Sequence, residues 1–144
     1  MDELIKAMKI AFSTEFSYYL KAHFFHWNVE GPDFSQYHDL FGKIYEEVYG
    51  SIDAFAENIR KLGAYTPGSY TRFSMLSQID EEIKVPTKDM MVSELLKDGE
   101  ICVDLLRKVF QLAESVGEHG ISDFIAARMD AHQKHNWMLR SSLK

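Results

Sequence analysis

The sequence predicts an all-α protein, a four-helix bundle with a short helix in the long crossover between helices two and three. Apolar residues recur at three- and four-residue steps along four long stretches, which is the spacing of a buried helix face. Only three prolines and eight glycines occur, and such sparse breakers favour long helices over many short strands. The length of 144 residues, with 46% hydrophobic and 26% charged residues, is that of one globular domain spanning residues 1–144.

The first long helix is expected from about Glu3 to His26. Its inward face carries apolar and aromatic residues at helical spacing, namely Leu4, Met8, Ala11, Phe12, Phe16, Tyr19, Leu20 and His23. Gly31 and Pro32 then break the helix. Because this turn is short, the next helix folds back beside the first.

The second long helix is expected to start after Asp33, a candidate N-cap, and to extend to about Leu62, with Gly63 as its C-terminal stop. Its apolar face consists of Phe41, Ile44, Val48, Ile52, Phe55, Ile59 and Leu62. The pattern then fails from Ala64 to Lys88. A connection of that length without structure is unusual in a compact domain, and we expect a short helix over residues 71–78. Such a crossover lets helices two and three lie parallel.

Two further helices complete the predicted bundle. The third extends from about Asp89 to Val116. A turn over residues 117–120 follows it, with Ser122 as a candidate cap of the last helix. The inward face of the last helix is expected to carry Phe124, Ile125, Met129, His132, Trp137 and Met138. The single Cys102 lies in an apolar stretch and is expected to be a buried thiol, which agrees with a reducing cytoplasm.

The charge balance argues against several classes of protein. Acidic residues outnumber basic ones 22 to 16, the net charge is −6, and no run of lysine or arginine occurs. Proteins that bind nucleic acid usually carry a basic patch or tail, so direct DNA binding is not expected. No stretch is long and apolar enough for a membrane span, and the N-terminus does not resemble a secretory signal. We therefore expect a cytoplasmic protein whose acidic surface attracts cations.

Two histidines and two acids on the first two helices form a candidate metal site, which consists of His26, His38, Asp53 and Glu57. Imidazole and carboxylate donors together suit iron and other borderline divalent metals. Asp53 and Glu57 are i, i+4 neighbours, so one ion can contact both. His38 precedes Asp53 by fifteen residues on the same helix, which is roughly 22 Å along the helix axis. A single ion cannot span that distance.

If all four residues bind one site, they must therefore come from two chains. In an isologous dimer the His38 end of one helix meets the Asp53–Glu57 end of its antiparallel copy, and each dimer carries two identical sites. The alternative is that the histidines are ordinary helix-end residues and the carboxylates belong to a solvated face. The usual intra-bundle iron motif, Glu-x-x-His, occurs nowhere in the chain, and its absence favours the shared site.

These residues carry a family resemblance. The segment from His23 to Phe34, followed by His38, Phe41, Tyr45 and residues 53–57, closely resembles the Dps-type mini-ferritins, and residues 132–140 are similar to the last helix of that family. The resemblance implies a ferritin-like four-helix bundle that assembles into a hollow homo-dodecamer. It also implies ferroxidase sites at two-fold interfaces, which oxidise ferrous iron with hydrogen peroxide in preference to oxygen. The ferric product would be stored inside the shell.

The resemblance also implies roles for individual residues. His26 and His38 of one subunit, with Asp53 and Glu57 of its mate, would hold iron in a di-iron or mono-iron site. Trp27, next to His26, resembles the site-adjacent tryptophan that intercepts oxidising intermediates, although simple packing would also account for it.

A route for iron through the shell is implied as well. The three-fold pores of the family are lined by acids from the region of Asp123 and Asp130, and Glu118 is a third candidate. Surface acids without any such role would look similar in sequence.

Two departures from the family pattern matter. Asn58 stands where the family usually has arginine, and no lysine-rich segment precedes the first helix. The second departure again argues against direct DNA binding. Two alternatives to the ferroxidase hypothesis remain: a nucleoid protein that shields DNA physically, and a shell whose metal site has degraded.

Overall fold

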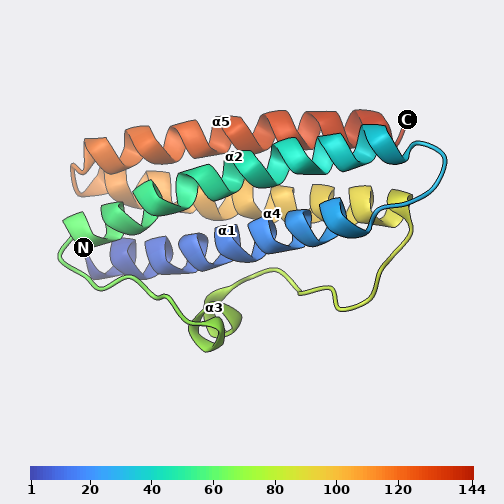
Figure 1. Ribbon diagram of the computed structural model, residues 1–144. Coiled ribbons are helices and arrows are strands. Elements are labelled where there is room, and N and C mark those ends of the chain that lie inside the picture. The colour runs from blue at the N-terminus through green and yellow to red at the C-terminus, as the bar shows by residue number, and fades with distance from the viewer.

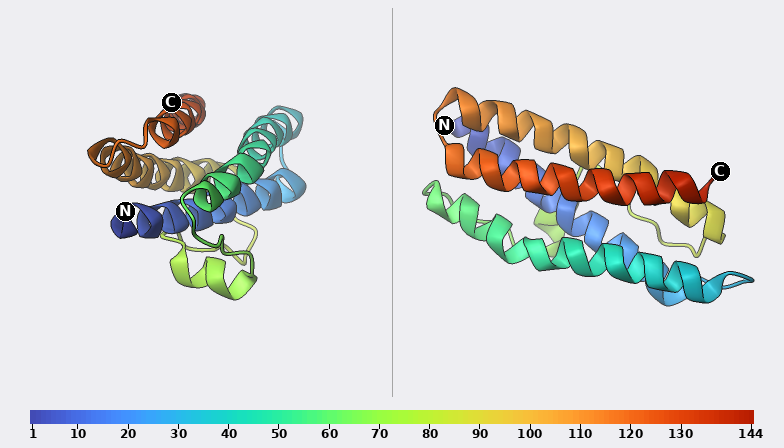
Figure 2. Two further views of the ribbon diagram at one scale, coloured as in Figure 1. Left: turned by 90° about the vertical axis from the view of Figure 1, so that its left-hand side faces the viewer. Right: turned by 90° about the horizontal axis from the view of Figure 1, so that it is seen from above.

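The structure, a computed structural model that describes residues 1–144, contains five helices and no strand. The four-helix bundle consists of α1 (Asp2–Asn28), α2 (Phe34–Lys61), α4 (Lys88–Ser115) and α5 (His119–Ser142). The short α3 (Tyr70–Leu76) lies beside α1, outside the four long helices (Figures 1 and 2). The predicted all-α bundle with a short helix in its crossover is therefore confirmed.

Short turns and one long crossover determine the order of the helices. Gly31, with φ +116°, and Gly63, with φ +87°, follow α1 and α2 in the left-handed region that glycine tolerates best. The crossover returns along the length of the bundle, so α2 and α4 run parallel (Figure 1). It is anchored on α1 through α3, where Phe73 stacks on Phe16 with ring centroids 4.5 Å apart.

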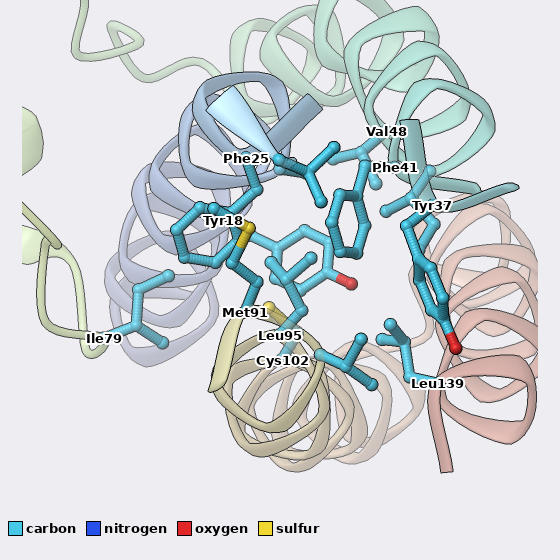
Figure 3. Close-up of a cluster of buried hydrophobic side chains, with 14 residues drawn as sticks. Tyr18, Phe25, Tyr37, Phe41, Val48, Ile79, Met91, Leu95, Cys102 and Leu139 are labelled. Atoms are coloured by element: carbon cyan, nitrogen blue, oxygen red, sulfur yellow. The ribbon is translucent and has the colours of Figure 1, made fainter. Parts of the chain in front are cut away.

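The interior of the bundle contains two apolar clusters with polar side chains between them. One cluster is built around Tyr18, Phe25 and Phe41 and includes Cys102 (Figure 3). The other surrounds Phe12, Phe55, Ile59 and Leu106 near the other end of the bundle. Burying each large side chain contributes about 1.5–3 kcal/mol, which explains why the apolar faces predicted from spacing meet in the core.

Some details differ from the predictions. The last helix begins at His119, and Ser122 lies inside it, where its hydroxyl donates to the carbonyl oxygen of Glu118 at 3.3 Å. The prediction that Ser122 caps this helix is therefore wrong, because the helix continues through Gly120. Leu20 and Trp137 were expected in the core, but they are 45% and 56% exposed. Leu20 instead borders a groove between α1 and the crossover, and Trp137 lies on the exposed side of α5.

None of the helices combines the length and the apolar character that a membrane span requires.

Candidate metal centre

His26, near the end of α1, and His38, near the start of α2, face each other across the α1–α2 turn. Their rings stack with centroids 3.8 Å apart and an interplanar angle of 19°. The Nδ1 atom of His26 lies 2.7 Å from the carbonyl oxygen of His38, and the Nδ1 atom of His38 lies 2.7 Å from the carbonyl oxygen of His26. A carbonyl oxygen can only accept, so each Nδ1 donates. In the neutral rings both Nε2 atoms are therefore left as metal donors with fixed orientation.

A glycine on α2 provides the space for this pair. An added Cβ at Gly42 would lie 3.1 Å from both Cε1 and Nδ1 of the His26 ring, which is closer than ordinary van der Waals contact. Gly50 lies on the same helix, and a Cβ there would have no atom within 4 Å. The two glycines thus differ in what a methyl group would meet, and this difference provides a test of the position of His26.

We expect Gly42→Ala to weaken ferrous-ion binding by about tenfold, because the methyl group displaces the imidazole and a loss of about 1.4 kcal/mol corresponds to a factor of ten. Anaerobic calorimetry with ferrous salt measures this. The matched control, Gly50→Ala, should leave the affinity unchanged and stabilise α2 by about 0.5–1 kcal/mol through helix propensity. Equal affinities for the two variants, in assemblies of equal size, would contradict the assigned position of His26.

An aromatic stack continues from the histidine pair along α1 and α2. We define it as Tyr19, His23, Trp27, Tyr45 and Tyr49. The His23 ring lies 3.7 Å from the Tyr45 ring, with an interplanar angle of 8°, and 3.9 Å from the Trp27 ring. The Tyr19 hydroxyl lies 3.0 Å from Nδ1 of His23. Burial, and then the proximity of His26, lower the pKa of His23, which favours its neutral form.

Trp27 lies at one end of this stack, and 59% of the residue is accessible to solvent. Its ring contacts His23 and also lines a groove of about 590 Å³ between α1 and the crossover. The other apolar residues of this groove are Phe16, Leu20, Phe24, Tyr70, Phe73 and Ile79. Trp27 therefore lies between His23 and an open apolar groove.

The two predicted carboxylate ligands lie elsewhere on α2. Asp53 and Glu57 are exposed, and neither forms an ion pair or a side-chain hydrogen bond within the chain. Helix α2 is continuous from Phe34 to Lys61, so the rise of roughly 22 Å between His38 and Asp53 applies. No three of the four predicted ligands come together in one chain. The histidine pair and the two carboxylates therefore lie far apart within one chain.

The three acids considered for an iron pore lie on or beside the first half of α5. Asp123 and Asp130 are exposed and seven residues apart, which places them on one face of the helix. Glu118 is half-buried at the N-cap position, where its side chain makes no cap hydrogen bond. This end of α5 lies at the opposite end of the bundle from the α1–α2 turn (Figure 1), so these acids are separate from the histidine pair.

The structure also assembles a buried cluster that the sequence analysis missed. Glu15 on α1, Cys102 on α4 and His132 on α5 are each at most 2% exposed, and their donor atoms all lie within 4.8 Å of one another. Oε2 of Glu15 lies 2.6 Å from Nε2 of His132. One feature of the sequence does indicate this cluster. Glu15 follows Ala11 by four residues and precedes Tyr18 by three, so it is a charged residue on the apolar face of its helix.

A salt-bridge network surrounds this cluster. Arg128 forms two hydrogen bonds to Glu47, and its Nε lies 3.7 Å from Oε1 of Glu15. Nε2 of His135 lies 2.8 Å from Oε1 of Glu47. Burial alone would raise the pKa of Glu47, but hydrogen bonds from His135 and Arg128 outweigh it and hold the pKa at about 2. Burial opposes ionisation of Glu15 as well, yet His132 and Arg128 keep the pKa of Glu15 below its usual value.

Comparison with known proteins gives a consistent result. Residues 5–144 match the family model of the ferritin-like domain. The chain is 36% identical over 122 residues to a low temperature-induced protein of Nostoc sp., covering 83% of this chain and 68% of that protein. It is 32% identical over 125 residues to DNA protection during starvation protein 2 of Bacillus anthracis, covering 87% and 86%. The crystal structure of Dps from Staphylococcus aureus superposes with a TM-score of 0.95 at 28% identity, covering 100% of this chain and 97% of that one.

Proposed function

This chain belongs to the ferritin-like family and, within it, to the Dps-type mini-ferritins, and we propose that it is a ferroxidase that stores iron. Iron storage and protection is the function of its family. The finer proposal is that ferrous iron is oxidised at sites shared by two subunits, preferentially with hydrogen peroxide, and that the ferric product is held in a hollow dodecamer. The observation that carries the proposal is the histidine pair, whose Nδ1 atoms are engaged and whose Nε2 atoms remain as donors.

The proposed site is completed by the carboxylates of a second copy. An antiparallel, two-fold related α2 brings Asp53 and Glu57 to the histidine pair and uses the same patch on both chains. Carboxylates without partners in their own chain support this arrangement. The apolar groove between α1 and the crossover also supports association with a second copy, because Leu20, Trp27 and Tyr70 are exposed and border it. An apolar surface of this kind marks an interaction site in a protein otherwise rich in charge.

The chemistry of such a site follows from its donors. Two ferrous ions and one peroxide molecule, with two protons, give two ferric ions and two water molecules, so both electrons that the peroxide takes come from iron. Asp53 and Glu57 favour the product, because anionic oxygen donors stabilise the higher charge of ferric iron. Transfer of a single electron would instead release a hydroxyl radical. We propose that Trp27, which is exposed and contacts His23, donates an electron to such an oxidant.

Iron must also enter the proposed shell. We propose that Asp123 and Asp130 attract ferrous ions on the exposed face of α5, with Glu118 near them. The net charge of −6 per chain adds to this attraction. The same net negative charge opposes binding to DNA phosphates, so DNA binding is not part of the proposal.

The test of the proposed function is oxidation of ferrous iron by the purified protein. Ferrous salt added anaerobically, followed by substoichiometric peroxide, should give a soluble ferric core that co-elutes with the protein in size-exclusion chromatography. Two ferrous ions should be consumed per peroxide, as the balanced reaction requires. A ferric precipitate that forms at the rate seen without protein would overturn the proposal.

A further inference from the structure

We propose that the centre of each four-helix bundle holds a second metal site, in which Glu15, Cys102 and His132 bind one thiophilic divalent cation of the zinc class. This site goes beyond the proposed function, because it lies inside a single chain and shares no residue with the interfacial site. It would hold a resident ion, whereas the interfacial site takes iron as substrate.

The geometry of the cluster suits such an ion. Its three side chains come from three helices, α1, α4 and α5, and all three are buried. Zinc binds cysteine sulfur at about 2.3 Å and histidine nitrogen or carboxylate oxygen at about 2.0–2.2 Å, in a tetrahedron. Donors around one zinc ion therefore stand less than about 4 Å apart. The donors here already lie within 4.8 Å of one another, so small side-chain movements bring them to bonding distance.

Buried polar atoms without partners point to a ligand at the same place. Nδ1 of His132 and the hydroxyl oxygen of Tyr18 are buried, and neither has a hydrogen-bond partner. The Tyr18 ring lies edge-on to His132 with ring centroids 4.9 Å apart, and Figure 3 shows Tyr18 and Cys102 within the same apolar cluster. Nearly all buried polar groups in folded proteins are paired. The water molecule that completes the tetrahedron around a bound cation would supply a hydrogen-bond partner here.

The charges around the cluster balance when such an ion is bound. Without metal, two carboxylates, Glu15 and Glu47, face one guanidinium, Arg128. A divalent cation that binds the neutral His132 imidazole and the Cys102 thiolate adds one net positive charge to this group. The two carboxylates, the guanidinium, the thiolate and the cation then sum to zero. The metal-bound state therefore adds no uncompensated charge to the core.

Arg128 does not occupy the position of the ion. Its Nε faces Oε1 of Glu15, whereas Oε2 of the same carboxylate faces His132. The two oxygens can therefore serve two cations, the guanidinium on one side and the metal on the other. Because every donor is buried, we expect the metal to enter while the chain folds rather than by exchange into the finished bundle.

The single cysteine of the chain makes this proposal directly testable with cobalt(II), an optical substitute for zinc. The protein would be produced in cobalt-supplemented medium, and in parallel refolded from guanidinium with cobalt(II), and then passed through a chelating column. We expect a near-ultraviolet sulfur-to-cobalt charge-transfer band and one retained cobalt per chain. Any such band must come from Cys102.

Matched variants separate this site from the interfacial one. The band should persist in Asp53→Ala/Glu57→Ala, which lacks the interfacial carboxylates, and in His135→Gln, which alters a neighbouring histidine outside the cluster. It should vanish in Cys102→Ser and in His132→Gln, with the retained cobalt falling from one per chain towards zero. Cys102→Ser should still oxidise iron at the wild-type rate.

Folded wild-type protein without this band, from both preparations, would overturn the inner site whatever the iron-oxidation result. Persistence of the band in folded Cys102→Ser protein would also overturn it. If either Cys102→Ser or His132→Gln fails to fold, the loss of the band is measured in the other variant. The wild-type spectrum alone tests whether the inner site exists.

Discussion

Mixing two inactive variants should restore ferroxidase activity towards about a quarter of the wild-type level, because random pairing makes about half of the dimers hybrid and each hybrid keeps one of its two sites. The first variant, His26→Ala/His38→Ala, lacks both histidine donors. The second, Asp53→Ala/Glu57→Ala, lacks both carboxylates. Each is expected to be nearly inactive alone, since every site in its homodimers lacks half of the donor set.

The experiment requires co-refolding of the two variants, native mass spectrometry to count hybrid dimers, and peroxide-driven iron oxidation as the activity. A matched control mixes His26→Ala with His38→Ala. Both changes affect the same half-site, so their hybrids contain no intact site, and the activity should not exceed the mean of the two variants. A site contained within one chain could not be restored in the first mixture. Activity indistinguishable from zero in mixtures with hybrid dimers present would refute the shared site.

Arg128→Met should lower the free energy of unfolding by about 3–5 kcal/mol, since removing one partner of a buried ion pair leaves the other charges uncompensated. Arg128 is the only guanidinium that contacts Glu15 and Glu47, and its side chain is 5% exposed. Methionine retains much of the apolar volume but none of the charge. Urea unfolding followed by circular dichroism, at pH 7 and one fixed subunit concentration, measures the loss.

A surface ion pair provides the control. Lys43 lies 3.2 Å from Asp39, and both side chains are about 70% exposed, so Lys43→Met should cost less than about 1 kcal/mol. A loss of stability of similar size in both variants would contradict the claim that burial makes the removal of Arg128 more costly.

The pH dependence distinguishes lost charge compensation from lost packing. Hydrogen bonds from His135 and Arg128 hold the folded-state pKa of Glu47 at about 2, below its usual 4.5. A lowered pKa contributes stability that is present above pH 4.5 and is lost as the pH falls towards 2. Without Arg128 the pKa of Glu47 rises, so the variant loses less stability between pH 4.5 and pH 2 than the wild type does. The difference in free energy of unfolding between wild type and Arg128→Met should therefore become smaller as the pH falls, whereas a packing defect would leave that difference constant.

The sequence by itself is sufficient to predict the four-helix bundle. It is also sufficient to argue that the predicted ligands, if they share one site, belong to two chains. Helix periodicity is local, so the apolar faces of α1 and α2 could be identified without knowledge of their partners. The fixed rise of a helix also separates His38 from Asp53 by a distance that needs no structure to calculate. The four candidate ligands also follow from their residue types and spacing, and the complementation experiment tests their role.

Only the tertiary structure decided how the side chains meet. The Nδ1 atoms of His26 and His38 bind each other's carbonyl oxygens because the α1–α2 turn brings two chain segments to a particular separation. The inner cluster depends on contacts far apart in sequence, since Glu15 and His132 are separated by 117 residues. Spacing along one helix predicts which face is buried. It does not predict which buried polar groups from different helices come together, because that depends on how the helices pack.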